Sequence, residues 1–239
     1  MARVMEGLLH KIVWPVSPEH RCPYLPDRQA REEIFLASVM DADDYVVLMN
    51  HGWRRSGCLF YRPRCDGCGE CVPIRLRTDT FRPSRSQRRV WRRNQDLTVT
   101  VGRPTLTGEK HRLYVRYLRQ RHDGTMGEDI EDLARFLYSS PIDTREMCYR
   151  LEGALVGVGI VDVSSTSVST VYFIFDPDLH RRSLGTFSTL WEIDWARQQG
   201  REYYYLGYLI RGLQSMSYKA TFGPHEVLGA DGQWHPADG

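Results

Sequence analysis

The sequence lacks any long apolar run. Its first 20 residues contain no apolar stretch long enough for the core of a signal peptide. No later segment approaches the roughly 20 apolar residues that a helix needs to cross a bilayer. We therefore expect a cytoplasmic protein with no membrane partner. Because thiols stay reduced in the cytosol, the six cysteines are not expected to form a disulfide framework.

Lysine is nearly absent, since only three of the 32 Lys and Arg residues are lysines. Arginine suits bidentate contacts with phosphate, although the codon bias of a GC-rich genome explains this composition equally well. The distribution of charge along the chain is more informative. Up to Arg103 there are 18 Lys and Arg residues against 12 Asp and Glu, whereas the remainder has 14 against 18. The N-terminal part is therefore basic, although the net charge is only +2.

Internal repeats and low-complexity linkers are also missing. A length of 239 residues is enough for one good core, or for two small cores that share an interface. The composition, 41% hydrophobic and 26% charged, is that of an ordinary soluble globular protein. We expect an N-terminal domain at 1–103, which holds the cysteine cluster and the arginines, and a C-terminal domain at 104–239.

Short strands surround one helix in the N-terminal part. Asp41 is the expected N-cap of this helix, and Gly52 is its expected stop. A second helix is expected to begin at Pro83 and Ser84. The strands are predicted at 32–39, 53–63, 72–78 and 97–101.

The C-terminal part has clearer periodicity. Two helices are predicted at 108–122 and 128–139, followed by three consecutive antiparallel strands at 145–151, 154–163 and 168–176. A loop then enters a helix that carries Leu190, Ile193 and Ala196 at helical spacing and ends at Gly200. A last strand is predicted at 202–210. This order indicates a mixed α/β architecture rather than a doubly wound one.

Three cysteines at every third position stand out in "CDGCGEC", residues 65–71. Gly67 and Gly69 permit the positive φ values with which such a tight loop turns its thiols inward. A fourth thiolate would complete a tetrahedral zinc or an iron–sulfur site. Cys22 is the first candidate for it and Cys58 the second, so the expected metal ligands are Cys22, Cys65, Cys68 and Cys71. The alternative is a reduced turn that binds nothing.

The segment 81–94 holds six arginines and no acidic residue. On a helix, five of them share one face, and Val90 and Trp91 lie on the other side, where they can attach the helix to the body. A solvated face would normally alternate charges of both signs. Like charges on one stripe favour a polyanion, and we expect tRNA or another nucleic acid to bind there. The expected contacts are Arg82, Arg85, Arg88, Arg89, Arg92 and Arg93.

A second candidate anion site is "RRSLGTF", residues 181–187, which follows a strand and opens a helix. Free N–H groups at a helix start, with an arginine beside them, bind anions. The alternative is that Gly185 only permits close packing of the helix on the sheet.

Several motifs together resemble the aminoacyl-tRNA–protein transferases. The motifs "CPYL", "GWRRSG", "YRPRCDGCGECVPIRL" and "FRPSRSQRRVWRRN" are similar to the N-terminal domain of that family. The motifs "VYFIFDPDL", "RSLGTF", "YYYLGY" and "MSYKATFGP" are similar to its C-terminal domain. The size and the form "CPYLP" resemble the bacterial aspartate/glutamate leucyltransferases more than the longer eukaryotic arginyltransferases.

The resemblance implies transfer of leucine from leucyl-tRNA to the α-amine of proteins that begin with Asp or Glu, in the N-degron pathway. It also implies an acyl-CoA N-acyltransferase (GNAT-like) fold for the C-terminal half, with no cofactor required for the chemistry. Phe187 occupies the last slot of the GNAT pyrophosphate loop, so coenzyme A is less expected than the acceptor end of tRNA. The residues expected to hold that end are Arg182, Ser183, Gly185 and Thr186.

The candidate catalytic residues lie mostly at the C-terminal ends of the central strands. Asp176 could anchor the substrate ammonium or take its proton, although it could equally only cap the turn before Pro177. Tyr172 and Tyr208 could donate hydrogen bonds or line the pocket, or belong to the core. Lys219 completes this set. An acidic substrate side chain also requires a cation, and the nominees are Arg181, Arg211 and Lys219.

Three alternatives stay open at this point. The first is a transferase of the same fold that moves arginine. The second is a non-catalytic RNA-binding module with a structural cysteine cluster. The third is an acyl-CoA-dependent N-acetyltransferase.

Overall fold

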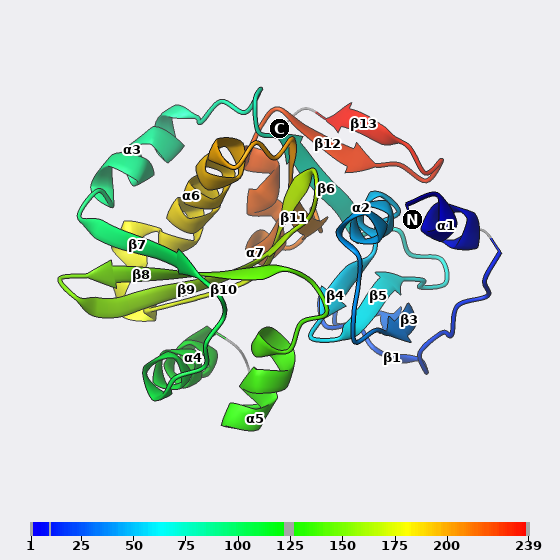
Figure 1. Cartoon of the computed structure of the whole chain (residues 1–239), viewed down its shortest axis with the longest axis horizontal. Helices are drawn as coiled ribbons and strands as arrows, with labels where there is room; N and C mark the ends of the chain where they lie inside the picture. The colour runs from blue at the N-terminus through cyan, green and yellow to red at the C-terminus, as the bar shows by residue number, and fades with distance from the viewer. Residues whose placement is uncertain (1, 10, 122–126, 238–239) are drawn as a thin grey trace.

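The centre of the molecule is one eight-stranded sheet. The computed structural model describes residues 2–9, 11–121 and 127–237. The strands of this sheet are β6 (Val72–Arg77), β7 (Leu97–Gly102), β8 (Thr144–Leu151), β9 (Ala154–Val163), β10 (Ser167–Phe175), β11 (Tyr203–Leu209), β12 (His225–Leu228) and β13 (Trp234–Ala237). Their order in space is β13-β12-β6-β11-β10-β9-β8-β7 (Figure 1). All neighbours are antiparallel except β10 and β11, which run parallel.

Helices cover both faces of this sheet (Figure 1). On one face lie α6 (Leu184–Gln198) and, packed against it, α3 (Arg85–Arg93). On the other face lie α4 (Gly108–Arg121) and α5 (Ile130–Leu133), and a π-helical turn (Ala134–Tyr138) continues α5. Among the residues that the structure describes, no helix has the length and apolar character that a membrane span requires.

Each face has its own apolar core. Leu190, Ile193 and Ala196 of α6 are buried against the sheet, which confirms the periodicity expected for this helix. Leu113 and Leu118 of α4 are buried in a second cluster on the opposite face. The sheet is therefore apolar on both sides near its centre, which is why β9 reads as a nearly continuous apolar run.

The N-terminal part forms a smaller unit at one end of the sheet. It contains α1 (Ala2–Leu9), α2 (Ala42–Asn50), a two-stranded ladder of β1 (His20–Arg21) and β2 (Gln29–Ala30), and a three-stranded sheet of β3 (Glu32–Leu36), β5 (Leu59–Pro63) and β4 (Arg54–Ser56). Asp41 is the N-cap of α2, as predicted, because its side chain accepts a hydrogen bond of 2.9 Å from Asp43 N. Trp53 and Phe60 fill a third core cluster here.

The strand predicted at 53–63 is wrong, because this segment is a hairpin. Its two arms, β4 and β5, pair antiparallel and turn at Gly57, which has a φ of +59°. A side chain at Gly57 is also excluded by space, since a Cβ there would lie 2.3 Å from the carbonyl oxygen of Arg135. The π-helical turn therefore packs directly on the hairpin.

The central topology follows the sequence prediction. β8, β9 and β10 are consecutive antiparallel strands, and α6 is the crossover that returns the chain to β11, parallel to β10. The mixed α/β class is thereby confirmed, and this order of elements is the one that the resemblance implied for the C-terminal half. The helix predicted at 108–122 is confirmed as α4 through Arg121, and His122 lies outside the described residues. The segment after β11 adds α7 (Gln214–Ser217), a 3-10 turn (Tyr218–Thr221) and the β12–β13 hairpin, which were not predicted.

The division expected at residue 103 does not coincide with the division between sheets. β6 belongs to the N-terminal segment, yet it lies inside the large sheet between β11 and β12. β7 also precedes residue 103 and forms the edge of that sheet beside β8. The N-terminal segment therefore contributes to both units.

Candidate active site

The parallel strands β10 and β11 part from each other at mid-length. They pair only from Ser167 to Ser169 and from Tyr203 to Tyr205. Beyond this point β10 has an irregularity between Thr170 and Tyr172, and β11 continues along β6 alone. Two parted strands leave backbone groups that do not pair with each other, so side chains from other elements can reach between them.

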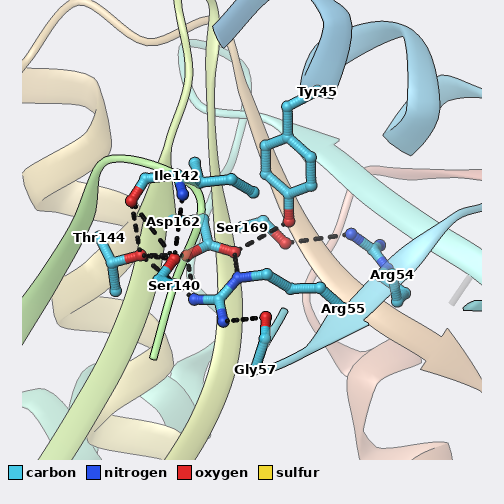
Figure 2. Close-up of polar contacts among 9 residues, drawn as sticks. All are labelled: Tyr45, Arg54, Arg55, Gly57, Ser140, Ile142, Thr144, Asp162 and Ser169. Atoms are coloured by element: carbon cyan, nitrogen blue, oxygen red, sulfur yellow. Dashed lines mark hydrogen bonds and ion pairs between the residues drawn. The ribbon is translucent and has the colours of Figure 1, made fainter. Parts of the chain in front are cut away.

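A buried ion pair fixes the β4–β5 hairpin against this region. Figure 2 shows the guanidinium of Arg55 on the carboxylate of Asp162 in β9, with distances of 2.6 Å from Nε and 2.5 Å from Nη2. Tyr45 and Thr144 donate further hydrogen bonds to this carboxylate, of 3.0 Å and 2.8 Å. Both charged side chains are fully buried. The pair therefore joins the N-terminal unit to the large sheet.

Arg54, the neighbour of Arg55, reaches the parting strands. Its Nη1 donates to Ser169 Oγ at 3.1 Å, and its Nη2 donates to the carbonyl oxygen of Gly207 at 3.2 Å (the first contact is drawn in Figure 2). Its guanidinium lies 5.2 Å from the ring centroid of Tyr205. Arg54 is 5% exposed, its Nε has no hydrogen-bond partner, and no carboxylate of the described residues pairs with it.

Lys219 approaches the same point from the 3-10 turn after α7. Its Nζ donates to the carbonyl oxygen of Tyr208 at 2.8 Å and contacts Met216 Sδ at 3.5 Å. Within the described ranges it too has no carboxylate partner, and it is 9% exposed. Burial, and then the positive charge of Arg54, lower the pKa of Lys219 from 10.5 to about 7. The structure thus brings together Lys219 and Tyr208, two of the four predicted catalytic residues.

Tyr208 is held by the N-terminal unit. Its hydroxyl donates to the carbonyl oxygen of Gly52 at 2.7 Å, and its ring lies 6.2 Å from that of Tyr61 in β5. Burial raises the pKa of Tyr208 well above its ordinary value, followed by the effect of Tyr61. The hydroxyl is therefore neutral, and its proton is already donated to the Gly52 carbonyl oxygen. Arg211, a predicted contact for acidic substrates, lies exposed in the turn after β11.

The other two predicted catalytic residues, Tyr172 and Asp176, do not join Lys219 and Tyr208. Tyr172 packs in the core between β10 and α4, with ring centroids 6.3 Å from Tyr117 and 5.0 Å from Phe136. Asp176 Oδ1 accepts a hydrogen bond of 3.0 Å from Asp178 N, and its Oδ2 lies 3.0 Å from Arg116 Nη1. These positions match the structural alternatives considered for the two residues, in which Tyr172 belongs to the core and Asp176 caps a turn. Their catalytic roles stay predictions.

The predicted arginine helix exists as α3. Ser84 is its N-cap, and a capping box with Gln87 closes its first turn. Gln87 is buried, and the ring of Trp91 lies 5.6 Å from that of Phe187 in α6, so the opposite side attaches the helix, as expected. We call the exposed side the arginine surface. Its members, none of which pairs with a carboxylate among the described residues, are Arg82, Arg85, Arg88, Arg89, Arg92 and Arg93.

The start of α6 meets the end of α3. Arg93 donates to the carbonyl oxygen of Arg181, whose side chain is exposed. Arg182 forms a bidentate pair with Asp96, at 2.8 Å for both contacts, and this guanidinium lowers the pKa of the Asp96 carboxyl. Arg182 is therefore already neutralised by a carboxylate. This arrangement differs from the free cation that the predicted anion site at the helix start requires.

The rest of that predicted loop is open. Ser183 has a φ of +54° where the 3-10 turn (Pro177–Arg182) passes into α6. A Cβ added to Gly185 would meet nothing within 4 Å, so close packing does not explain this glycine. Thr186 lies beside it in the first turn and is partly exposed. Ser183, Gly185 and Thr186 therefore stay predicted contacts of the tRNA acceptor end.

The four predicted metal ligands lie in two neighbouring loops. Cys22 follows β1, and its Sγ accepts a hydrogen bond of 3.4 Å from Leu25 N. Cys65, Cys68 and Cys71 lie between β5 and β6, and Gly67 has the expected positive φ, whereas Gly69 does not. Burial raises the pKa of Cys71 to about 12, and the next contributions come from the other three thiols, so all four are neighbours. Across the described residues, no three potential ligands converge on one point as the side chains stand.

Sequence reasoning missed Arg54, Ser169 and Gly207 as members of this site. "GWRRSG" was recognised as a motif, but nothing local indicates which arginine is paired and which is not. Arg54 and Gly207 are separated by 153 positions in the chain. Only the three-dimensional structure brings them together.

Comparisons with known proteins cover almost the whole chain. A family model described as "Arginine-tRNA-protein transferase, N terminus" matches residues 20–89, and its C-terminal counterpart matches residues 109–229. A curated aspartate/glutamate leucyltransferase of Marinobacter nauticus is 40% identical over 95% of this chain and 96% of its own. That of Saccharophagus degradans is 42% identical over 90% of this chain and 92% of its own.

Solved structures resemble the chain more distantly. L-PGS from Bacillus licheniformis is 14% identical, with a TM-score of 0.47 over 74% of this chain and 52% of its own. A GCN5-related N-acetyltransferase from Kribbella flavida is 13% identical, with a TM-score of 0.39 over 76% of this chain and 62% of its own.

Proposed function

The chain belongs to the family of aminoacyl-tRNA–protein transferases, and we propose that it transfers leucine from leucyl-tRNA to the α-amine of proteins that begin with Asp or Glu. The choice of leucine rests on the curated leucyltransferases, which match it over at least 90% of its length. A transferase that uses aminoacyl-tRNA acts where that tRNA is made, so a cytoplasmic location is part of the proposal.

One structural observation carries the proposal: the arginine surface ends beside the turn that follows β10 and leads into α6. β10 leads into the 3-10 turn and then α6, so the start of α6 lies at the end of β10 where the strands diverge. Arg93, in the last turn of α3, contacts Arg181 in the 3-10 turn that precedes α6. A tRNA stem bound along α3 would therefore direct its acceptor end toward the parted strands. Unpaired arginines contact phosphates without reading base sequence, which suits an enzyme that holds tRNA by its backbone.

The reaction needs positioning more than strong acid–base catalysis. A neutral α-amine attacks the ester carbonyl, the new amide C–N bond forms, the C–O bond to the tRNA ribose breaks, and the amine proton passes to the ribose oxygen. A chain amine has a pKa near 7.7–8.0, so roughly a tenth is neutral at pH 7. Holding amine and ester in contact supplies up to about 7–11 kcal/mol in well-oriented cases.

Purified protein tests the proposal directly. We expect it to add leucine from charged leucyl-tRNA to peptides beginning with Asp or Glu, detected by mass spectrometry. The same peptides beginning with Ala serve as controls. Transfer of arginine but not leucine would favour the arginyl alternative, and tRNA binding with no transfer would favour an RNA-binding module.

The four thiols fit a metal site in number and kind, and we propose that they bind zinc or an iron–sulfur cluster. Four thiolates suit either centre. The buried thiol of Cys71 resists ionisation, and a bound cation would provide the missing stabilisation for its thiolate. The chemistry proposed above requires no metal, so the centre would fix the loop that leads into β6.

Metal content checks this expectation. Anaerobically purified protein should contain about one equivalent of zinc, or iron with the absorption of a cluster, and Cys65→Ser should lose it. Cys148→Ser, which changes a cysteine in β8 far from the loop in sequence, is the control and should retain it. A metal-free wild type and an equally stable Cys65→Ser variant would instead indicate a reduced turn.

A further inference from the structure

Arg54 and Lys219 are exceptions among the buried cations of this protein. Burying a charge is costly, so buried cations are normally paired with carboxylates. Arg55 pairs with Asp162, Lys110 with Glu146 and Arg75 with Glu226, and each of these cations is at most about a tenth exposed. The same chain therefore shows the usual arrangement three times.

Arg54 and Lys219 meet at Gly207 without such a partner. Arg54 donates to the Gly207 carbonyl oxygen, and a Cβ added to Gly207 would lie 3.4 Å from Lys219 Nζ. Their neighbours among the described residues are a serine, two backbone carbonyls, aromatic rings and the thiol of Cys71, none of which is a carboxylate. The effect of each charge on the other is unfavourable, because Arg54 lowers the pKa of Lys219. Two cations are thus held close together, and no carboxylate of the described residues lies between them.

The unused donor also points to a ligand. Arg54 Nε is buried and makes no hydrogen bond to any described residue, although leaving such a group unsatisfied costs free energy. The guanidinium offers a planar fork that matches a carboxylate, and an ammonium beside it adds a further donor. A single carboxylate placed here could accept a hydrogen bond from Nε and would neutralise one of the two positive charges.

We propose that Arg54 and Lys219 bind the side-chain carboxylate of the N-terminal Asp or Glu of the substrate protein, an assignment that rests on the proposed function. A tRNA phosphate is also anionic, but the nucleic-acid chain continues on both sides of it. The side chain of a protein's first residue, by contrast, ends at its carboxylate. A free side-chain end suits cations that are less than a tenth exposed, because it needs no room for a continuing chain. The arginine surface, by contrast, is open to a continuous polyanion.

Peptide binding tests this subsite without tRNA. Fluorescence anisotropy should show that Arg54→Gln and Lys219→Met each weaken binding of an Asp- or Glu-initiated peptide by about 10- to 100-fold. Binding of the Asn- or Gln-initiated peptide should change little, so the preference for acid over amide should shrink. If both variants keep the wild-type preference, the subsite is wrong, whatever the transfer assay gives. A wild type that binds these peptides selectively but does not transfer leucine would instead refute only the proposed reaction.

Thermal unfolding separates this role from a structural one. Lys219→Met removes an unpaired buried charge, so its unfolding temperature should rise or stay constant. Lys110→Met is the matched control: it leaves Glu146 buried without its cation, so its unfolding temperature should fall while the peptide preference stays at the wild-type value. A clear loss of stability in Lys219→Met would contradict the proposal, because it would mean that the cation serves the fold itself.

Discussion

Replacing Asp162 by alanine should lower the free energy of unfolding by about 3–5 kcal/mol, because it leaves the Arg55 guanidinium buried without its partner. Both side chains are fully buried, and the carboxylate also accepts hydrogen bonds from Tyr45 and Thr144. These contacts connect four elements, α2 and β4 of the N-terminal unit with β8 and β9 of the large sheet. The loss should appear in urea unfolding as a lower midpoint with an unchanged slope.

Two controls define the cause of that loss. Asp194→Ala breaks an exposed pair with Arg197 and should cost less than about 1 kcal/mol. Arg55→Met combined with Asp162→Leu removes both buried charges, and it should recover much of the stability lost in Asp162→Ala. A loss below about 1 kcal/mol in Asp162→Ala itself would show that the pair does not hold the two units together.

Reversing two charges of the arginine surface should weaken tRNA binding by about 10- to 100-fold. At 4 Å in water one reversal changes the Coulomb energy by about 2 kcal/mol, and screening in salt reduces this value. Arg88→Glu with Arg92→Glu is the variant of choice, because both side chains are exposed and neither pairs with a carboxylate among the described residues. The salt dependence should also flatten, with the slope falling by about 2 for two lost phosphate contacts.

The matched control carries the same change of charge on the other face. Arg119→Glu with Arg135→Glu alters exposed residues of α4 and the π-helical turn, which lie across the sheet from α3 (Figure 1). This variant should keep the wild-type affinity and slope. Equal weakening in both variants would show that tRNA responds to net charge rather than to this surface.

Much of the fold could be predicted because its signals are local. Ser84 and Gln87 stand three residues apart before an arginine run, and together they form the capping box of α3. The strands β8 to β10 were predicted from their apolar patterns and turn signals. The hairpin at Gly57 was missed because both arms have the same alternating pattern, and the glycine is required by a contact with Arg135, 78 positions away.

The site was less predictable than the fold because its contacts are long-range. Lys219 and Tyr208 were proposed as candidates and do lie together, but Arg54 was not, since its sequence neighbour Arg55 is chemically identical. The two arginines differ in their surroundings: Asp162 lies beside Arg55, whereas no carboxylate of the described residues lies beside Arg54. Arg182 was predicted as a free cation but is paired with Asp96. That pairing depends on how α3 and α6 pack, which the sequence does not reveal.

The position of β6 has a consequence for how the chain can be divided. This strand comes from the N-terminal segment but fills the place between β11 and β12, so a fragment beginning at residue 104 would expose two strand edges in the middle of its sheet. The complementary fragment would carry β6 without either neighbour. We expect neither half to be an autonomous folding unit, and activity from a split chain would require the fragments to recombine through β6 and through β7, which pairs with β8 at the sheet edge. The two family models that match the chain therefore describe successive stretches of sequence rather than separable modules.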